Sequence, residues 1–135
     1  MSSRRSLGVV LLSRYVHHST PIYRELRRFF RTYWVGSRLA RRITPLNALP
    51  IIVYEALTSI LLAVRHRSLV LISFYLGLEA FLSALLGKLL RVKVLCFAIG
   101  SDVYHVKSSL HRALLRFTIR NVDVVACVSR GVERR

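Results

Sequence analysis

Short apolar runs alternate along this chain with longer segments of mixed polarity. Residues 7–12, 69–74, 92–97 and 124–128 are nearly continuous stretches of aliphatic and aromatic side chains. Runs of this length are typical of strands that are buried on both faces of a sheet. A further short strand is expected within residues 35–43. The pattern therefore predicts four buried strands and a fifth, shorter one.

Between the first two runs, apolar side chains recur at helical spacing. After a loop at residues 13–19, Thr20 and Pro21 are expected to start a helix, with Thr as the N-cap and Pro at the first helical position. Pro45 and Pro50 are expected to bracket a turn further along. The helix that starts at Pro21 would have an apolar face and a basic face. The apolar face would be Ile22, Leu26, Phe29, Phe30 and Tyr33, and the basic face Arg24, Arg27, Arg28 and Arg31.

Three more helices are predicted further along the chain. Residues 51–64 are mostly apolar, and Glu55, Thr58 and Ser59 would form a narrow polar stripe. Residues 77–90 have the spacing of a buried helix. Ser108 or Ser109 would cap the last helix. Its inward face would be Leu110, Leu114 and Phe117, and its outward face Arg112, Arg116 and Arg120.

The alternation of strands and helices predicts a single α/β domain. Strands joined by helices of this length form βαβ crossovers, and hence a doubly wound, Rossmann-like parallel sheet with helices on both faces. In such sheets ligands bind outside the carboxyl ends of the strands, near the point where the strand order reverses. The segments expected at that edge are residues 13–20, 73–77, 100–105 and 129–131.

One segment allows a different interpretation. Residues 68–87 are about as long as a helix that spans a bilayer. Glu79 lies near the middle of this segment, where an acidic group in a membrane helix costs roughly 2.5 kcal/mol or more. A strand followed by a buried helix explains the same residues without that cost, and we favour it over a membrane-spanning helix.

Charge narrows the choice of partner. The chain has 22 Lys and Arg residues against 6 Asp and Glu, a formal net charge of +16. This excess favours an anionic partner, either a phospholipid surface, a nucleic acid or a phosphorylated small molecule, although genome composition or a hot habitat also enriches arginine. Nucleic acid is disfavoured because no helix-turn-helix, zinc or RNA-recognition pattern is present. Cys96 and Cys127 each lie in an apolar run and are expected to be buried thiols, and no metal site is predicted.

Gly100, Ser101 and Asp102 are the most informative residues at the predicted binding edge. Glycine permits a tight turn or a close approach of the backbone to a ligand. The neighbouring hydroxyl and carboxylate suit the hydroxyl groups of a sugar, whereas an ordinary turn after a strand is the alternative. Further candidates for the same edge, as bases, phosphate contacts or lining, are His17, His18, Thr20, Tyr75 and His105. No catalytic residue is assigned, and His66 and His111 are expected to be exposed.

Three segments together resemble one known family. Residues 92–103, VKVLCFAIGSDV, are similar to the turn after a central strand in the amino-terminal domain of family-4-type GT-B glycosyltransferases. Residues 121–135, NVDVVACVSRGVERR, resemble the last strand of that domain, with Asp123 before the apolar residues and Ser129 after them. Residues 68–94 resemble the preceding strand, helix and Gly-Lys connection. The resemblance covers residues 68–135, and residues 7–67 agree with it only in layout.

The resemblance implies that residues 1–135 form the acceptor-side half of a GT-B fold. Gly100, Ser101, Asp102 and Ser129 would then bind substrate. Enzymes of this family close two Rossmann-like domains around a nucleotide sugar, and this sequence contains no carboxyl-terminal, donor-binding domain. The domain alone would therefore bind no cofactor and be inactive. A donor-binding domain or subunit would be its partner, and the nucleotide sugar the co-substrate of the complete enzyme.

Two departures from the family pattern concern catalysis rather than fold. Many relatives have His where this chain has Ile99, immediately before the glycine of the turn. Many also have a pair of glycines in the loop after the first strand, and residues 13–20 contain none.

The basic helix suggests where the domain would act. Arg24, Arg27, Arg28 and Arg31 would suit an anionic membrane, where each basic residue contributes roughly 1 kcal/mol, although an ordinary solvent-facing helix is the alternative. We expect a cytoplasmic domain, peripheral on the inner face of the membrane. It would serve a glycosyltransferase that moves a sugar from a nucleotide sugar to a lipid-linked or polysaccharide acceptor. The alternative function is a non-catalytic, basic, membrane-associated domain that anchors or recruits another protein.

Overall fold

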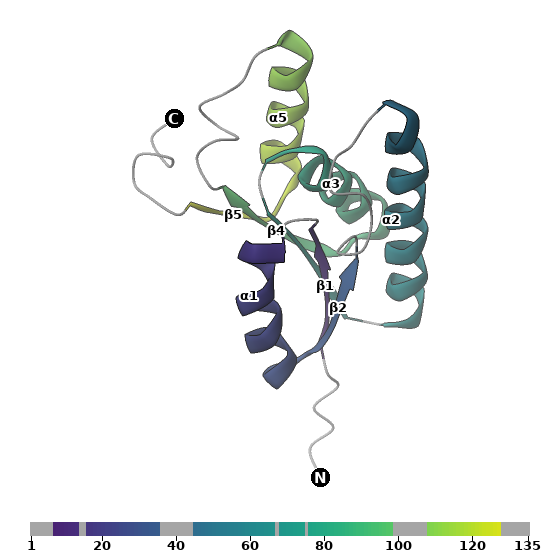
Figure 1. Cartoon of the computed structure of the whole chain (residues 1–135), viewed down its shortest axis with the longest axis vertical. Coiled ribbons are helices and arrows are strands. Elements are labelled where there is room, and N and C mark those ends of the chain that lie inside the picture. Colours follow the sequence, from purple (N-terminus) through teal and green to yellow (C-terminus); the bar gives the residue numbers. More distant parts are fainter. Residues whose placement is uncertain are drawn as a thin grey trace.

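Five parallel strands form the centre of the molecule (Figure 1). The computed structural model describes residues 7–13, 16–35, 45–66, 68–74, 76–98 and 108–127. The strands are β1 (Gly8–Leu12), β2 (Arg31–Val35), β3 (Leu69–Phe74), β4 (Lys93–Ala98) and β5 (Val124–Cys127), in the sheet order β2-β1-β3-β4-β5. The helices between them are α1 (Val16–Phe29), α2 (Pro45–Arg65), α3 (Leu78–Leu90) and α5 (Ser109–Asn121).

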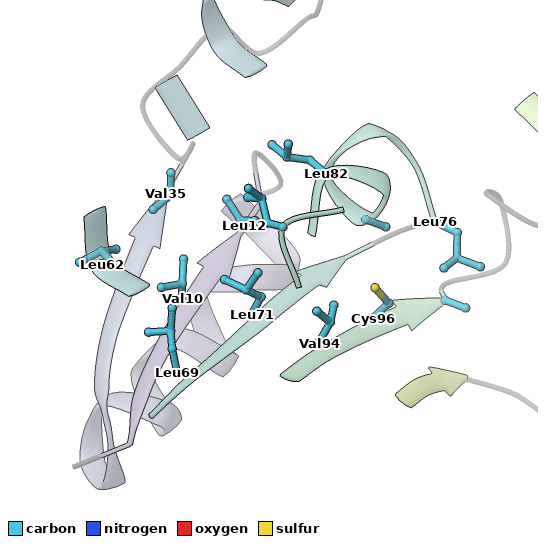
Figure 2. Close-up of a cluster of buried hydrophobic side chains, with 13 residues drawn as sticks. Val10, Leu12, Val35, Leu62, Leu69, Leu71, Leu76, Leu82, Val94 and Cys96 are labelled. Atoms are coloured by element: carbon cyan, nitrogen blue, oxygen red, sulfur yellow. The ribbon is translucent and has the colours of Figure 1, made fainter. Parts of the chain in front are cut away.

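Helices cover both faces of this sheet. On one face α2, α3 and α5 pack over a buried cluster that includes Val10, Leu71 and Val94 (Figure 2). On the other face α1 packs Ile22 and Leu26 against a second cluster formed by β1, β3 and β4. Because successive side chains of a strand point to opposite faces, β1 contributes alternate residues to the two clusters. The predicted doubly wound, Rossmann-like α/β domain is confirmed.

Most predicted element boundaries agree closely with the structure. The runs at residues 7–12, 69–74, 92–97 and 124–128 correspond to β1, β3, β4 and β5. Gly77 is the N-cap of α3, and Ser108 is the N-cap of α5. The Ser108 hydroxyl accepts a hydrogen bond from the backbone N–H of His111 at 3.1 Å. These boundaries were predictable because buried strands and capping serines have strong local signals.

The region between β1 and β2 differs from the prediction. Helix α1 begins at Val16, so His17, His18 and Thr20 belong to the helix and Pro21 lies inside it. The helix ends at Phe29, and the second strand is residues 31–35 rather than a segment of 35–43. The helical spacing that seemed to continue to Tyr33 overlaps the period-2 pattern of β2, which directs Tyr33 and Trp34 to opposite faces. Arg31 is therefore on a strand and not on the basic face of α1.

Helix α2 also differs from the prediction, in length and in orientation. Pro45 and Pro50 lie within the helix instead of bracketing a turn. Glu55 and Ser59, two residues of the predicted narrow polar stripe, are buried. The side that carries the small residues Ala56, Ser59 and Ala63 packs inward, because small side chains let a helix approach the sheet closely. A helix that is apolar on nearly every side gives no contrast from which the inward face could be predicted.

Several single residues were placed wrongly from the sequence. Leu110 is 68% exposed, because it lies in the first turn of α5 beyond the sheet, while Leu114 and Phe117 are half-buried as expected. Cys127 is exposed, because β5 is an edge strand. His66 is half-buried rather than exposed, and its Nε2 lies 2.9 Å from the Tyr33 hydroxyl in a hydrogen bond.

The possibility of a membrane-spanning helix can be checked directly. Among the helices in the described ranges, none is both long and apolar enough to cross a bilayer. Residues 69–74 and 78–90, which a spanning segment would have to include, form a strand and a separate helix.

Candidate functional site

The carboxyl edge of the sheet is where the fold can form a ligand site. All neighbouring strands are parallel, so β1, β3, β4 and β5 end at the same edge. The chain runs from β1 outward to β2 and then returns to β3 on the other side of β1, so the strand order reverses between β1 and β3. Helices α3 and α5 follow β3 and β4, so both begin at this edge. The geometry therefore agrees with the edge that the sequence pattern indicated.

Buried polar groups gather where the strand order reverses. Ser13, directly after β1, is fully buried; its N–H donates to the carbonyl of Val35 at 3.3 Å, and its carbonyl accepts from the indole of Trp34 at 2.9 Å. Glu79 is 4% exposed in the first turn of α3, where the helix dipole favours a negative charge. The bonds of Ser13 hold the ends of β1 and β2 together.

A pocket of about 350 Å³ lies at this edge of the sheet, between the amino ends of α3 and α5. One wall comes from the segment that enters α3, and the other from the first turns of α5. The lining residues are Leu76, Gly77, Leu78, Ser108, Leu110, His111 and Leu114. Four leucines make the walls mainly apolar, while a hydroxyl, an imidazole and backbone amides supply polar groups. The pocket therefore suits a ligand that combines an apolar part with a polar or anionic part.

The amino end of α3 borders the pocket and has no side-chain cap. Gly77 caps the helix without any side-chain hydrogen bond to the first-turn amides. A Cβ atom built on Gly77 would meet no heavy atom within 4 Å outside its chain neighbours, so the space next to Gly77 is open. The first N–H groups of a helix have no partner inside the helix and attract anions or hydroxyl oxygens. At α5 the equivalent end is partly satisfied by the Ser108 hydroxyl.

The buried thiol near this edge is not a nucleophile at neutral pH. The Cys96 sulfur lies 2.9 Å from the Ser73 hydroxyl, and both residues are fully buried. Burial raises the pKa of Cys96 to about 11, and the hydrogen bond with Ser73 only partly offsets that rise. The thiol stays protonated and acts as a small core residue.

Most of the predicted site residues lie outside the described residues. These are Gly100, Ser101, Asp102, His105, Tyr75 and Ser129. Ala98 and Ser108, the described residues on either side of the segment 99–107, lie at the end of β4 and at the N-cap of α5. His17 and His18 are in the first turn of α1, but their side chains are outside the description, and Thr20 is half-buried in the same helix.

The sequence did not identify several residues that line the pocket. His111 was expected to be an exposed helix residue, yet it is half-buried and lines the pocket three positions after the N-cap. Leu76 lies in the segment 73–77, which was expected at the binding edge, and Leu78 was assigned only to the helix predicted at residues 77–90. A usable signal was present, because a Leu-Gly-Leu sequence at a predicted helix start leaves apolar side chains next to uncapped amides.

Asp123, which comes directly before β5, has a structural role at the opposite edge of the sheet. Its carboxylate accepts the N–H of Val94 at 2.8 Å and forms an ion pair with the Lys93 ammonium at 3.1 Å. The backbone hydrogen bond, followed by that from Lys93, lowers the pKa of Asp123. Its backbone N–H also donates to the carbonyl of Val94, so Asp123 joins the start of β5 to β4.

Within the described ranges, no group of three or more His, Cys, Asp or Glu side chains could hold a metal ion. The polar groups of the pocket are suited to hydrogen bonding of a neutral or anionic ligand instead. When the chain is compared with models of known protein families and with curated protein sequences, it matches none of them.

Proposed function

We propose that this domain binds the acceptor in a two-part glycosyltransferase, which moves a sugar from a nucleotide sugar to a lipid-linked or polysaccharide acceptor. The observation that supports this proposal best is the pocket between the amino ends of α3 and α5, at the carboxyl edge of a doubly wound parallel sheet. The proposal also uses the sequence resemblance of residues 68–135 to the acceptor-side domain of family-4-type enzymes.

The lining of the pocket suggests a role for each part. Leu76, Leu110 and Leu114 would hold the apolar portion of an acceptor. The open first turn of α3 would bind a phosphate or hydroxyl oxygen through its amides. Ser101 and Asp102, in the segment that precedes α5, would hydrogen-bond the hydroxyl groups of the acceptor sugar, with Gly100 permitting the turn.

Among the described residues, His111 and Glu79 are titratable groups in the first turns of α5 and α3, the two helices whose amino ends border the pocket. His111 lines the pocket, and Glu79 is buried in the first turn of α3. A glycosyl acceptor must lose the proton of its attacking hydroxyl, and a group within hydrogen-bond reach can accept it. We assign His111 as the candidate proton acceptor, because it lines the pocket whereas Glu79 does not.

The proposal requires a second component. A GT-B enzyme binds most of its nucleotide sugar on a carboxyl-terminal domain, so a donor-binding domain or subunit would be the partner and the nucleotide sugar the co-substrate. Ser129, after β5, would lie where the chain leaves this domain. The domain alone would hold its acceptor without transferring a sugar to it. A lipid-linked acceptor would also keep the domain peripheral on the inner face of an anionic membrane, which a net charge of +16 favours.

A transfer assay tests this function. The chain is combined with a donor-binding GT-B domain from the adjoining coding sequence, then given radiolabelled nucleotide sugars and a membrane lipid extract. We expect label in the lipid or polysaccharide fraction only when both halves are present. Asp102→Ala should lower the rate about hundredfold by misplacing the acceptor, whereas Asp123→Asn, at the opposite edge, should leave the rate nearly unchanged at pH 7. Absence of transfer from every donor, together with absence of binding between the halves, would contradict the proposal.

One observation favours the second candidate function, a non-catalytic anchoring domain. The outward side of α2 is apolar, and a surface of this kind is suited to holding a domain on another structure. The transfer assay separates the two functions, because an anchoring domain would bind its target and never support transfer.

A further inference from the structure

Helix α2 exposes an unusual concentration of apolar side chains. The described part of the chain exposes fourteen large apolar side chains, and eight of them belong to this helix. The outward α2 face, as we name it, consists of Leu46, Leu49, Val53, Tyr54, Leu57, Ile60, Leu61 and Val64. Most are separated by three or four residues, which places them on one side of the helix. A continuous apolar face of this kind on a single domain marks a contact with something else.

Charge is absent from this face and present at its end. The only acidic residue of α2, Glu55, is 1% exposed on the inward side. The only basic residue, Arg65, is exposed in the last turn. An apolar helix face with an aromatic side chain and a terminal arginine is suited to the boundary between lipid headgroups and acyl chains. There the arginine reaches the headgroups while the apolar side chains enter the acyl region.

The charges of the domain distinguish between a lipid surface and a second copy of the chain. At +16, two copies repel each other, whereas an anionic lipid surface attracts each copy. In the described ranges the exposed carboxylates are Glu25 and Asp123, and each already forms an ion pair within the chain, with Arg28 and Lys93. Glu55 and Glu79 are buried. The described surface thus offers no spare carboxylate to the arginines of another copy.

The fold also separates this face from the arginines of α1. Ile22 and Leu26 of α1 pack on one face of the sheet, while Leu62 of α2 packs on the other. Figure 1 shows the two helices on opposite sides of the sheet. The outward sides of α1 and α2 therefore face away from each other, and a flat membrane cannot contact both. The arginines of α1 are also partly engaged within the helix, since Arg28 pairs with Glu25 and Arg27 lies 5.5 Å from the centre of the Tyr23 ring.

From these observations we infer that the outward α2 face is the surface through which the domain rests on an anionic lipid bilayer, in place of the arginine face of α1. The inference rests on the peripheral membrane location proposed above but not on sugar transfer. The helix would lie along the bilayer with its apolar side chains below the headgroups. Attraction between the basic domain and anionic lipid would add to this contact without requiring a specific headgroup.

Two double variants with the same change in charge test this inference. Leu57→Glu with Val64→Glu places two carboxylates on the outward α2 face, at side chains that are 62% and 79% exposed. Arg24→Gln with Arg28→Gln removes two positive charges from α1. Each double variant lowers the net charge by two, so non-specific attraction to anionic lipid falls equally. Binding of the chain to vesicles of phosphatidylcholine with one third phosphatidylglycerol is measured by sedimentation in 0.15 M salt.

The inference predicts different effects from the two variants. The α2 variant should bind vesicles at least tenfold more weakly, which corresponds to about 1.4 kcal/mol. The α1 variant should stay within about threefold of the original chain, because exposed charges are screened at this salt concentration. Circular dichroism is used to check that both variants are folded. If the α2 variant does not fold, Leu46→Glu replaces it, since Leu46 is 93% exposed at the amino end of the helix, where a carboxylate is favourable.

Three results would overturn the inference. One is an original chain that does not bind anionic vesicles even at low salt. Another is an α2 variant that binds as tightly as the original chain, or an α1 variant that loses binding instead. The third is an original chain that elutes as a dimer, with an α2 variant that elutes as a monomer and binds vesicles normally; the face would then contact a second copy. A failure of sugar transfer alone would leave the vesicle result unaffected, so the two proposals can fail separately.

Discussion

Replacing Gly87 with alanine probes how closely α3 packs on β4. A Cβ atom built on Gly87 would lie 2.3 Å from Cγ2 of Val94 and 3.2 Å from the carbonyl oxygen of Val92. Carbon atoms prefer separations of about 3.5–4.0 Å, so the valine methyl group must move by more than about 1 Å. Val94 is 1% exposed, and its branched side chain has little rotational freedom. Neither the side chain nor the backbone carbonyl can yield cheaply.

The expected magnitude follows from two opposing terms. Alanine is better than glycine inside a helix by about 1 kcal/mol, which favours the variant. Overpacking of a buried site costs about 1–3 kcal/mol, and the short distance places this site near the upper end of that range. We therefore expect Gly87→Ala to lower the free energy of unfolding by about 1–2 kcal/mol. An estimate from helix propensity alone would have the opposite sign.

A double-mutant cycle in urea isolates the contact. Val94→Ala alone should cost about 2 kcal/mol through lost burial, but it also removes the methyl group that Gly87→Ala would strike. In the Val94→Ala background, Gly87→Ala should therefore be neutral or stabilising, giving a coupling energy of at least about 1 kcal/mol. Unfolding is followed by circular dichroism, with m-values compared to confirm the same transition. Gly87→Ala that stabilises the original chain, or effects that simply add, would refute this packing.

Three further predictions concern pH and backbone conformation. Burial raises the pKa of Cys96 from 9.0 to about 11, so the folded state keeps its thiol proton to a higher pH than the unfolded chain does. We therefore expect the free energy of unfolding to fall by about 2–3 kcal/mol as pH rises from about 9 to 11. Urea titrations give the free energy of unfolding at each pH. Plotted against pH, the values for the original chain should fall more steeply than those for Cys96→Ala, and parallel plots would contradict the burial of the thiol. Because hydrogen bonds to Val94 and Lys93 lower the pKa of Asp123, its contribution is present above the unfolded pKa of about 3.8 and lost as pH falls through the folded value. Asp123→Asn should lower the free energy of unfolding by about 1 kcal/mol at pH 7, a small value because Asp123 is exposed to solvent. In strong acid the variant should be as stable as the original chain. An equal loss of stability at pH 2 would count against the ionic bond. Arg91 ends α3 in the left-handed conformation, with φ at 55°, which glycine adopts more easily than other residues. Arg91→Gly should therefore raise stability by about 0.5–1 kcal/mol, measured as a higher midpoint of thermal unfolding. A lower midpoint would be evidence against the left-handed conformation.

The sequence predicted the sheet well because its strands are nearly pure apolar runs. β1, β3, β4 and β5 are buried on both faces or lie beside such a strand, so their composition alone identifies them. β2 was missed in part because Tyr33 and Trp34 also fit the helical spacing of the preceding residues. Helix α2 was found, but its orientation was not, since only packing against the sheet decides which of two apolar sides is buried.

The candidate site was predicted as an edge rather than as a set of contacts. Parallel topology places the ends of β1, β3 and β4 together, and the sequence pattern was sufficient to infer this. The pocket at that edge depends on where α3 and α5 begin relative to each other, which is a long-range property. The half-buried position of His111 follows from this arrangement and has no local signal. Gly100, Ser101 and Asp102 stay predictions, since they lie outside the described residues.

In the proposed function, the pocket between the amino ends of α3 and α5 binds a sugar acceptor with an apolar portion. Its most direct test is a titration of the ¹⁵N-labelled chain with octyl glucoside below its micelle concentration, followed by amide chemical shifts. Using the variant with Leu57→Glu and Val64→Glu removes detergent binding to the outward α2 face. We expect saturable shifts at Gly77, Leu78, Ser108 and His111. Unchanged amides at these positions, or shifts confined to the opposite edge around Lys88 and Asn121, would contradict it.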